Sequence, residues 1–188
     1  MNLLRPFAGL LLVLAGLSGA LSGCLSAPTY PIEPSIDFKD LSVVRSSPGR
    51  GVPTDTFKIT IDFKDGDGDL GLTAAEIAAP PYDTKNPDGS FNPNQEFNYY
   101  LRVYQRVPPS TQFEEIIALR EYSHFPLLNG SVDGKTSPLK GDLTFRRFFA
   151  FGSPFNAGDE VRFTVSIKDR ALNESNTVTS STHVMLPR

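Results

Sequence analysis

The chain has 188 residues, a formal net charge of −3 and a single cysteine. Its lysines and arginines form no basic cluster, which argues against a nucleic-acid partner and against a polybasic grip on anionic lipid. With one thiol at most, the sequence also excludes an intrachain disulfide and a zinc site built from several thiolates.

The first 23 residues have the layout of a secretory signal. Arg5 precedes an apolar run, residues 7–21, that is broken only by small side chains. This run is too short and too rich in Gly and Ser to favour a membrane-spanning helix. Cys24 follows Leu-Ser-Gly, which resembles the lipobox of bacterial lipoproteins. The resemblance implies that residues 1–23 are removed and that the acylated Cys24 thiol tethers the protein to a membrane.

A proline-rich segment follows the cysteine. Pro28, Pro31 and Pro34 lie in a stretch that carries almost no charge. Such a composition favours an extended polyproline conformation. We therefore predict a tether over residues 24–37 and one folded domain over residues 38–188.

Alternation of apolar and polar side chains dominates the rest of the sequence. Residues 57–63 and 161–168 alternate strictly, and residues 99–104 follow the same period. This pattern is typical of strands with one face on a core and the other in water. Shorter candidate strands are residues 41–45, 113–119, 143–150 and 176–186. The only helical hint is a turn or two at residues 73–78.

About seven such strands in a domain of this length predict an all-β fold, an immunoglobulin-like antiparallel sandwich. An eight-stranded barrel is the alternative, but it requires more evenly spaced strands. Two long irregular segments, residues 79–95 and 122–141, interrupt the predicted sandwich. Loops of this length are usually functional or disordered. Tyr82, Phe91 and several asparagines in the first segment suit a binding surface for a sugar or a protein, and a mobile loop in solvent is the alternative.

The most distinctive segment directly follows the predicted strand at residues 57–63. Asp65, Asp67 and Asp69 alternate with Gly66 and Gly68. The three carboxylates repel one another unless a cation neutralises them. A hard divalent cation takes oxygen ligands readily, so the pattern favours calcium. The alternative is a glycine-rich hairpin turn, which explains one Asp-Gly pair but not three aspartates in register.

The spacing of this acidic loop resembles the calcium loops of EF-hands and dockerins. With Asp65 at position one, Gly71 falls at seven, where a backbone carbonyl ligates, and Glu76 falls at twelve, where a bidentate carboxylate belongs. The loop departs from the EF-hand pattern because Leu70 replaces the turn glycine and because a strand precedes it. The flanking helices of an EF-hand are therefore not implied.

A second polar loop is expected to approach the first. Asp169 and Asn173 follow the predicted strand at residues 161–168. In an immunoglobulin-like sandwich, the loop after the second strand and the loop between the last two strands lie at the same end. We therefore predict that Asp169 joins the calcium ligands, in a structural site with a Kd of the order of 10⁻⁴–10⁻³ M. The alternative is a tight turn closed by its own hydrogen bonds.

Three stretches together resemble a group of uncharacterised lipoproteins from Bacteroidota. They are the lipobox, the run from Phe63 to Gly71, and the run from Lys168 to Asn176. The resemblance implies a sandwich domain anchored to the outer membrane, and it implies no assigned activity. Many surface lipoproteins of that group carry acidic residues just after the cysteine. Leu-Ser-Ala follows Cys24 here, so surface and periplasmic facing both stay open.

The sequence carries no catalytic motif. His124 and His183 are too few for a three-histidine zinc site, and the alternation around His183 predicts that it faces solvent. We predict a non-enzymatic envelope protein that binds a protein or glycan partner. A purely structural envelope component is one alternative. The other is a hydrolase or hydrolase accessory, with paired carboxylates drawn from Glu114, Glu115, Glu121 and Asp142.

Overall fold

The computed structural model describes residues 28–47, 49, 51–128 and 137–187. The predicted signal, Cys24 and the start of the predicted tether lie outside these residues. Within the described part of the chain, no helix is both long and apolar enough to cross a bilayer.

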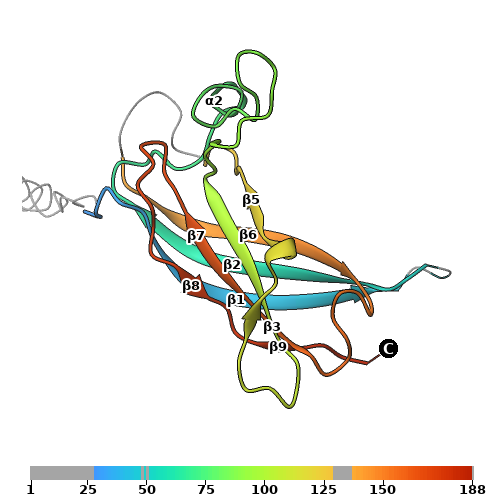
Figure 1. Cartoon of the computed structure of the whole chain (residues 1–188). Coiled ribbons are helices and arrows are strands. Elements are labelled where there is room, and N and C mark those ends of the chain that lie inside the picture. Colours follow the sequence, from blue (N-terminus) through green and yellow to red (C-terminus); the bar gives the residue numbers. More distant parts are fainter. Residues whose placement is uncertain (1–27, 48, 50, 129–136, 188) are drawn as a thin grey trace, which may run out of the picture.

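Two antiparallel sheets pack face to face (Figure 1). The first sheet has three long strands in the order β1-β2-β6. Their bounds are Ser35–Ser46 for β1, Thr54–Asp65 for β2 and Leu139–Ala150 for β6. β2 is central and pairs with a neighbour along its whole length on both sides.

The second sheet is built around β3 and β7, which pair over eight residues. Two short strands, β4 and β5, add to the free side of β3, and two others, β8 and β9, add to β7. The bounds are Tyr99–Arg106 for β3, Glu114–Glu115 for β4, Glu121–Ser123 for β5, Glu160–Ile167 for β7, Val178–Thr179 for β8 and His183–Val184 for β9.

This strand order confirms the predicted immunoglobulin-like sandwich. β1, β2 and β6 occupy the places of strands A, B and E, whereas β3 and β7 occupy those of C and F. The segment from β2 to β3 is therefore the B–C loop (residues 66–98), and the segment from β7 to β8 is the F–G loop (residues 168–177). Both loops lie at the same end of the sandwich (Figure 1).

Several element boundaries differ from those predicted. Residues 113–119 form only β4 and a 3₁₀ turn, Ile117–Leu119, because Ile116 donates a backbone hydrogen bond to Val103 and the chain then turns back. β5 lies partly within a predicted loop. β1 begins at Ser35 and buries Ile36, so the strand extends into the predicted tether. The helical hint is confirmed as α2, Ala74–Ile77.

The core lies between the inward faces of the two sheets. At its centre, Phe57 packs edge-on against Phe149 and at a tilt against Phe163, at centroid distances of 5.5 and 5.3 Å. Each fully buried side chain of this kind contributes about 1.5–3 kcal/mol through burial. The core members with no exposed surface include Phe57, Ile59, Ile61, Leu101, Val103, Val161, Phe163 and Ile167.

The prediction that His183 faces solvent is wrong. Its ring packs edge-on against Phe57 at 5.4 Å, and burial lowers its pKa. The reason is the register of β9, which pairs His183 with Val161 on β7. Directly paired residues share a face, and Val161 points into the core. Val184, the next residue, is half exposed instead.

Candidate metal centre

Three aspartates from two loops meet at the end of the sandwich where β2 and β7 finish. Asp65 is the last residue of β2, Asp69 lies in the B–C loop, and Asp169 lies in the F–G loop. One carboxylate oxygen from each of these residues, which we call the acidic triad, lies within 4.8 Å of the other two. Calcium–oxygen distances are about 2.3–2.6 Å, so oxygens on opposite sides of one ion are about 5 Å apart. The spacing therefore fits a single shared cation.

Asp65 is the most unusual member of the acidic triad. It is 0% exposed, and neither of its carboxylate oxygens has a hydrogen-bond partner of normal geometry. One oxygen each of Asp67 and Asp69 is also buried without a partner. Burying an unpaired carboxylate is costly, because the lost hydration is not replaced. The cluster thus presents several negative oxygens that need a counter-charge.

The electrostatics of the triad follow from this burial. Desolvation, followed by the charges of neighbouring aspartates, raises the pKa of Asp65 to about 7. Desolvation and the charge of Asp169 raise the pKa of Asp69 to about 6. Desolvation also raises the pKa of Asp169 itself, against its hydrogen bonds with Asn173. Near neutral pH, the triad therefore holds its protons more tightly than free aspartates do.

A tight turn presents Asp169 to the acidic loop. The Asn173 backbone N–H donates to Asp169 Oδ1 at 2.8 Å, and the Asn173 side-chain amide donates to Oδ2 at 2.7 Å. Between them, Leu172 adopts a left-handed φ of 68° that lets the chain reverse. The two readings of this segment are therefore compatible, since the turn is closed by its own hydrogen bonds and also delivers Asp169 to the triad.

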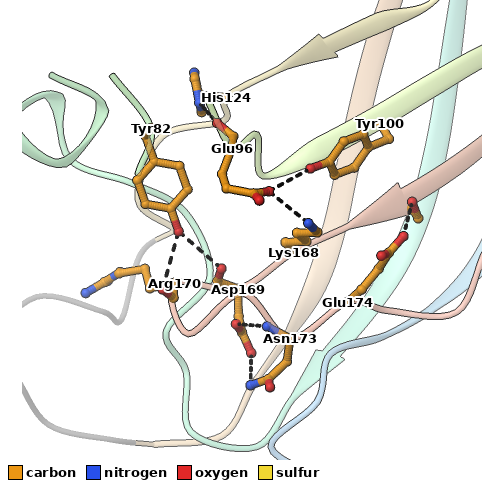
Figure 2. A network of polar contacts seen from close by, with 10 residues as sticks. Tyr82, Glu96, Tyr100, His124, Lys168, Asp169, Arg170, Asn173 and Glu174 are labelled. Carbon is orange, nitrogen blue, oxygen red and sulfur yellow. Dashed lines mark hydrogen bonds and ion pairs between the residues drawn. The ribbon is translucent and has the colours of Figure 1, made fainter. Parts of the chain in front are cut away.

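The two loops are fastened together by side chains that the sequence did not single out for this role. The Tyr82 hydroxyl lies 3.3 Å from the carbonyl oxygen of Arg170 and 3.5 Å from that of Asp169 (Figure 2). Arg170 Nε donates to the carbonyl of Gly71 at 3.0 Å. Tyr82 was expected at a binding surface, but it is only 4% exposed. No local pattern could reveal this contact, because its two partners are distant in sequence.

Two of the predicted ligands have other tasks. Glu76 Oε2 accepts hydrogen bonds from the backbone N–H and the hydroxyl of Thr73, which closes a capping box on α2. Its pKa is lowered by these bonds, and the structure does not bring it to the triad. The Gly71 carbonyl accepts from Arg170. The EF-hand spacing misleads here because a capped helical turn at Thr73 needs the same glutamate.

Asp67 lies outside the acidic triad but influences its charge. It is not one of the three residues whose carboxylate oxygens lie within 4.8 Å of one another. Its charge is nevertheless close enough to raise the pKa of both Asp65 and Asp69. A cation bound to the triad would therefore also neutralise the charge of Asp67.

The basic residues on either side of Asp169, Lys168 and Arg170, form hydrogen bonds and ion pairs with groups outside the acidic triad. Lys168 Nζ lies 2.9 Å from Glu96 Oε2, which also accepts from the Tyr100 hydroxyl (Figure 2). Arg170 is directed to Gly71 and lies 3.7 Å from Glu76. Among the described residues, no lysine or arginine forms an ion pair with the acidic triad. The charge of Arg170 acts to lower the pKa of Asp69, so the protein compensates the charge of the cluster only in part.

Comparison of this chain with protein-family models, with curated proteins and with solved structures gave no match. The candidate centre therefore rests on its own geometry and charge.

Proposed function

We propose that this chain is a lipid-anchored, non-enzymatic β-sandwich of the bacterial cell envelope whose loop end is held by a calcium ion. The observation that supports the ion is Asp65, a fully buried carboxylate whose oxygens have no hydrogen-bond partner of normal geometry, next to two further carboxylates. Calcium takes six to eight oxygens in flexible geometry, and water or backbone carbonyls would complete its shell. Magnesium fits less well because it demands near-octahedral geometry and keeps its waters.

The role of this ion is structural. It would join the B–C loop, which supplies Asp69, to the F–G loop, which supplies Asp169. The chain has a single cysteine, so no intrachain disulfide can do this work. The affinity expected of such an extracellular site is of the order of 10⁻⁴–10⁻³ M.

The carboxylates considered for hydrolysis support a non-enzymatic protein. Glu115 pairs with Arg120 at 2.6 Å, Asp142 pairs with Lys39 at 2.6 Å, and Glu121 pairs with Arg147. Hydrogen bonds keep the pKa values of Glu115 and Asp142 low, whereas a general acid needs a raised value. Glu114 is exposed.

Attachment to the outer membrane and binding of a protein or glycan partner complete the proposal. The long B–C loop supports a partner at this end, because Phe91 on it is 68% exposed. The anchor depends on Cys24, so Cys24→Ala should move the protein from the membrane fraction to the soluble fraction. Continued sedimentation of Cys24→Ala with membranes would contradict the anchor.

The calcium site is tested on the full chain after treatment with a chelator. Calcium is added, and binding is followed by calorimetry while the melting temperature is measured in parallel. At one hundred times the Kd, binding should stabilise the folded state by about 2.7 kcal/mol. Magnesium at the same concentration should produce a smaller shift. Identical melting temperatures with chelator and with calcium at one hundred times the expected Kd would defeat the proposal.

A further inference from the structure

The outer edge of β6 is long and regular. β6 is the last strand of its sheet, and its twelve residues pair with β2 without any shift of register. Such an edge offers a row of backbone N–H and C=O groups to any strand that can align with it. Natural proteins usually protect edges of this length.

The opposite edge of the same sheet is protected in three ways. β1 has a register shift between Phe38 and Asp40. The Asn176 side chain exchanges two hydrogen bonds with the backbone of Ile36, at 2.9 and 2.8 Å. Arg45 donates to two carbonyls of the C-terminal segment. Among the described residues, only β2 hydrogen-bonds to the backbone of residues 140–149.

The side chains along β6 alternate between two faces. The solvent face carries Lys140, Asp142, Thr144, Arg146 and Phe148, and the last of these is 63% exposed. The other face carries Leu143 and Phe145, which border a cavity of about 370 Å³. At its midpoint the strand thus borders a cavity whose other wall is formed by Tyr99 and by residues 124–126 and 128.

We propose that β6 pairs antiparallel with β6 of a second copy of this chain, in the register centred on Thr144. In this register, Asp142 of each copy lies opposite Arg146 of the other, so the symmetry produces two opposite-charge pairs. Leu143 likewise lies opposite Phe145 twice, on the inner face. Directly opposed pairs of these types stabilise antiparallel sheets.

Neighbouring registers lack this complementarity. To keep each side chain on its own face, the centre must move by a whole residue along the strand. A centre at Leu143 places Lys140 opposite Arg146, which is repulsive. A centre at Phe145 places Asp142 opposite Phe148, which removes both opposite-charge pairs. The sequence of this edge therefore favours one self-pairing over its neighbours.

Both charged partners are accessible for such pairing. Arg146 is exposed and forms no ion pair within the described part of the chain. Asp142 pairs with Lys39, but its side chain remains 49% exposed. A two-fold axis would close the assembly at a dimer and extend the three-stranded sheet of each copy into one continuous sheet.

The decisive experiment traps the register with a disulfide. In the full chain with Cys24→Ser, Thr144→Cys places two thiols opposite each other, with Cβ atoms about 4.5–5.5 Å apart. A disulfide needs about 3.5–4.5 Å, so small adjustments allow it to form. Thr60→Cys is the matched control, because Thr60 lies beside Thr144 with hydroxyl oxygens 3.0 Å apart but on the central strand. The two copies of residue 60 would be about 14 Å apart, three strand spacings.

Covalent dimers of Thr144→Cys, with Thr60→Cys remaining monomeric, are the expected result. Equal yields from the two variants would indicate random collision and overturn the proposal. A chain that stays monomeric with both variants would also overturn it. The partner of the β6 edge would then be an extended segment of another protein.

Charge exchange provides a second readout on the chain without thiols. Arg146→Asp places aspartates opposite each other at both outer pairs, so the Kd for dimerisation, measured by sedimentation, should rise about tenfold or more. The double variant Asp142→Arg with Arg146→Asp should restore it, whereas Lys85→Asp, an exposed change on the B–C loop, should leave it unchanged. An unchanged Kd for Arg146→Asp, or a double variant that fails to dimerise, would overturn the register.

Discussion

The carboxylates of Asp65 and Asp169 approach within 4.8 Å, although one ends β2 and the other follows β7 in the facing sheet. The sandwich topology brings their loops to one end, and neither carboxylate meets a lysine or arginine among the described residues. Repulsion between buried like charges opposes folding. A divalent cation would convert this repulsion into an attraction that joins the two sheets at their loops.

Asp65→Asn should abolish the stabilisation by calcium. The substitution removes the buried charge and one ligand, so the melting temperature with chelator should rise or stay level. The gain with calcium, about 2.7 kcal/mol at one hundred times the Kd for the unaltered protein, should disappear. Calorimetric melts measure both the melting temperature with chelator and the gain with calcium. Asp37→Asn, at a side chain that is 78% exposed, is the control and should keep the full response. A full calcium response in Asp65→Asn would contradict the assignment.

The stability of the calcium-free protein should decrease as pH rises from about 4 to 7. Folding raises the pKa of Asp65 from 3.8 to about 7 and that of Asp69 to about 6, so the folded state holds more protons than the unfolded state in this window. Stability falls with pH wherever the folded state binds more protons. Glu76, whose pKa is lowered, has the opposite effect at lower pH, and His183, whose pKa is lowered from 6.5 by burial, has the opposite effect in the upper part of the window. The difference between the unaltered protein and Asp65→Asn isolates the contribution of the triad.

Calcium competes with these protons, so its stabilising effect should increase over the same range. The measurement is the difference in melting temperature between calcium and chelator at several pH values from 5 to 8. A difference that does not depend on pH would contradict the prediction. Asp65→Asn provides the control, because it removes the group with the larger shift.

The fold could be predicted because apolar and polar side chains alternate along its central strands. Phe57, Ile59 and Ile61 alternate with polar residues and are all fully buried. The short edge strands carry no such pattern. β5 has only three residues, and its pairing with β3 is set by contacts from distant parts of the chain. The placement of His183 failed for the same reason, since a two-residue strand takes its face from its partner.

The acidic site could be predicted in part. The alternation of Asp65, Asp67 and Asp69 marked the loop, and the topology rule brought Asp169 to it. Glu76 was assigned from spacing within a motif, but its local role in capping α2 decides its position. Tyr82 could not be assigned from sequence, because its hydroxyl contact depends on how two loops pack together.

Asn98→Ala should strongly destabilise the fold. Asn98 is 0% exposed, and its side chain exchanges hydrogen bonds of 2.7 and 3.0 Å with the backbone of Phe125. The substitution leaves the Phe125 N–H buried and unpaired, whereas the Phe125 carbonyl still accepts from the Leu72 N–H at 3.2 Å. One unpaired buried donor costs about 1–3 kcal/mol, so denaturant unfolding should show a loss of about that size. Asn94→Ala, at an exposed position of the same loop, should change stability by less than about 0.5 kcal/mol. Equal losses for the two variants would show that the hydrogen bonds of Asn98 contribute nothing measurable to the free energy of unfolding.

Tyr82→Phe should weaken calcium binding without removing a ligand. The change deletes the hydroxyl near the carbonyl oxygens of Asp169 and Arg170 but keeps the ring against His124, at a centroid distance of 5.8 Å. Loss of one such bond costs about 0.5–1.5 kcal/mol, which corresponds to a Kd for calcium about two- to tenfold higher. Titration calorimetry measures this, with Tyr104→Phe on the outer face of β3 as the control. If Tyr82→Phe binds calcium as tightly as the control does, the contact between the loops contributes nothing to the site.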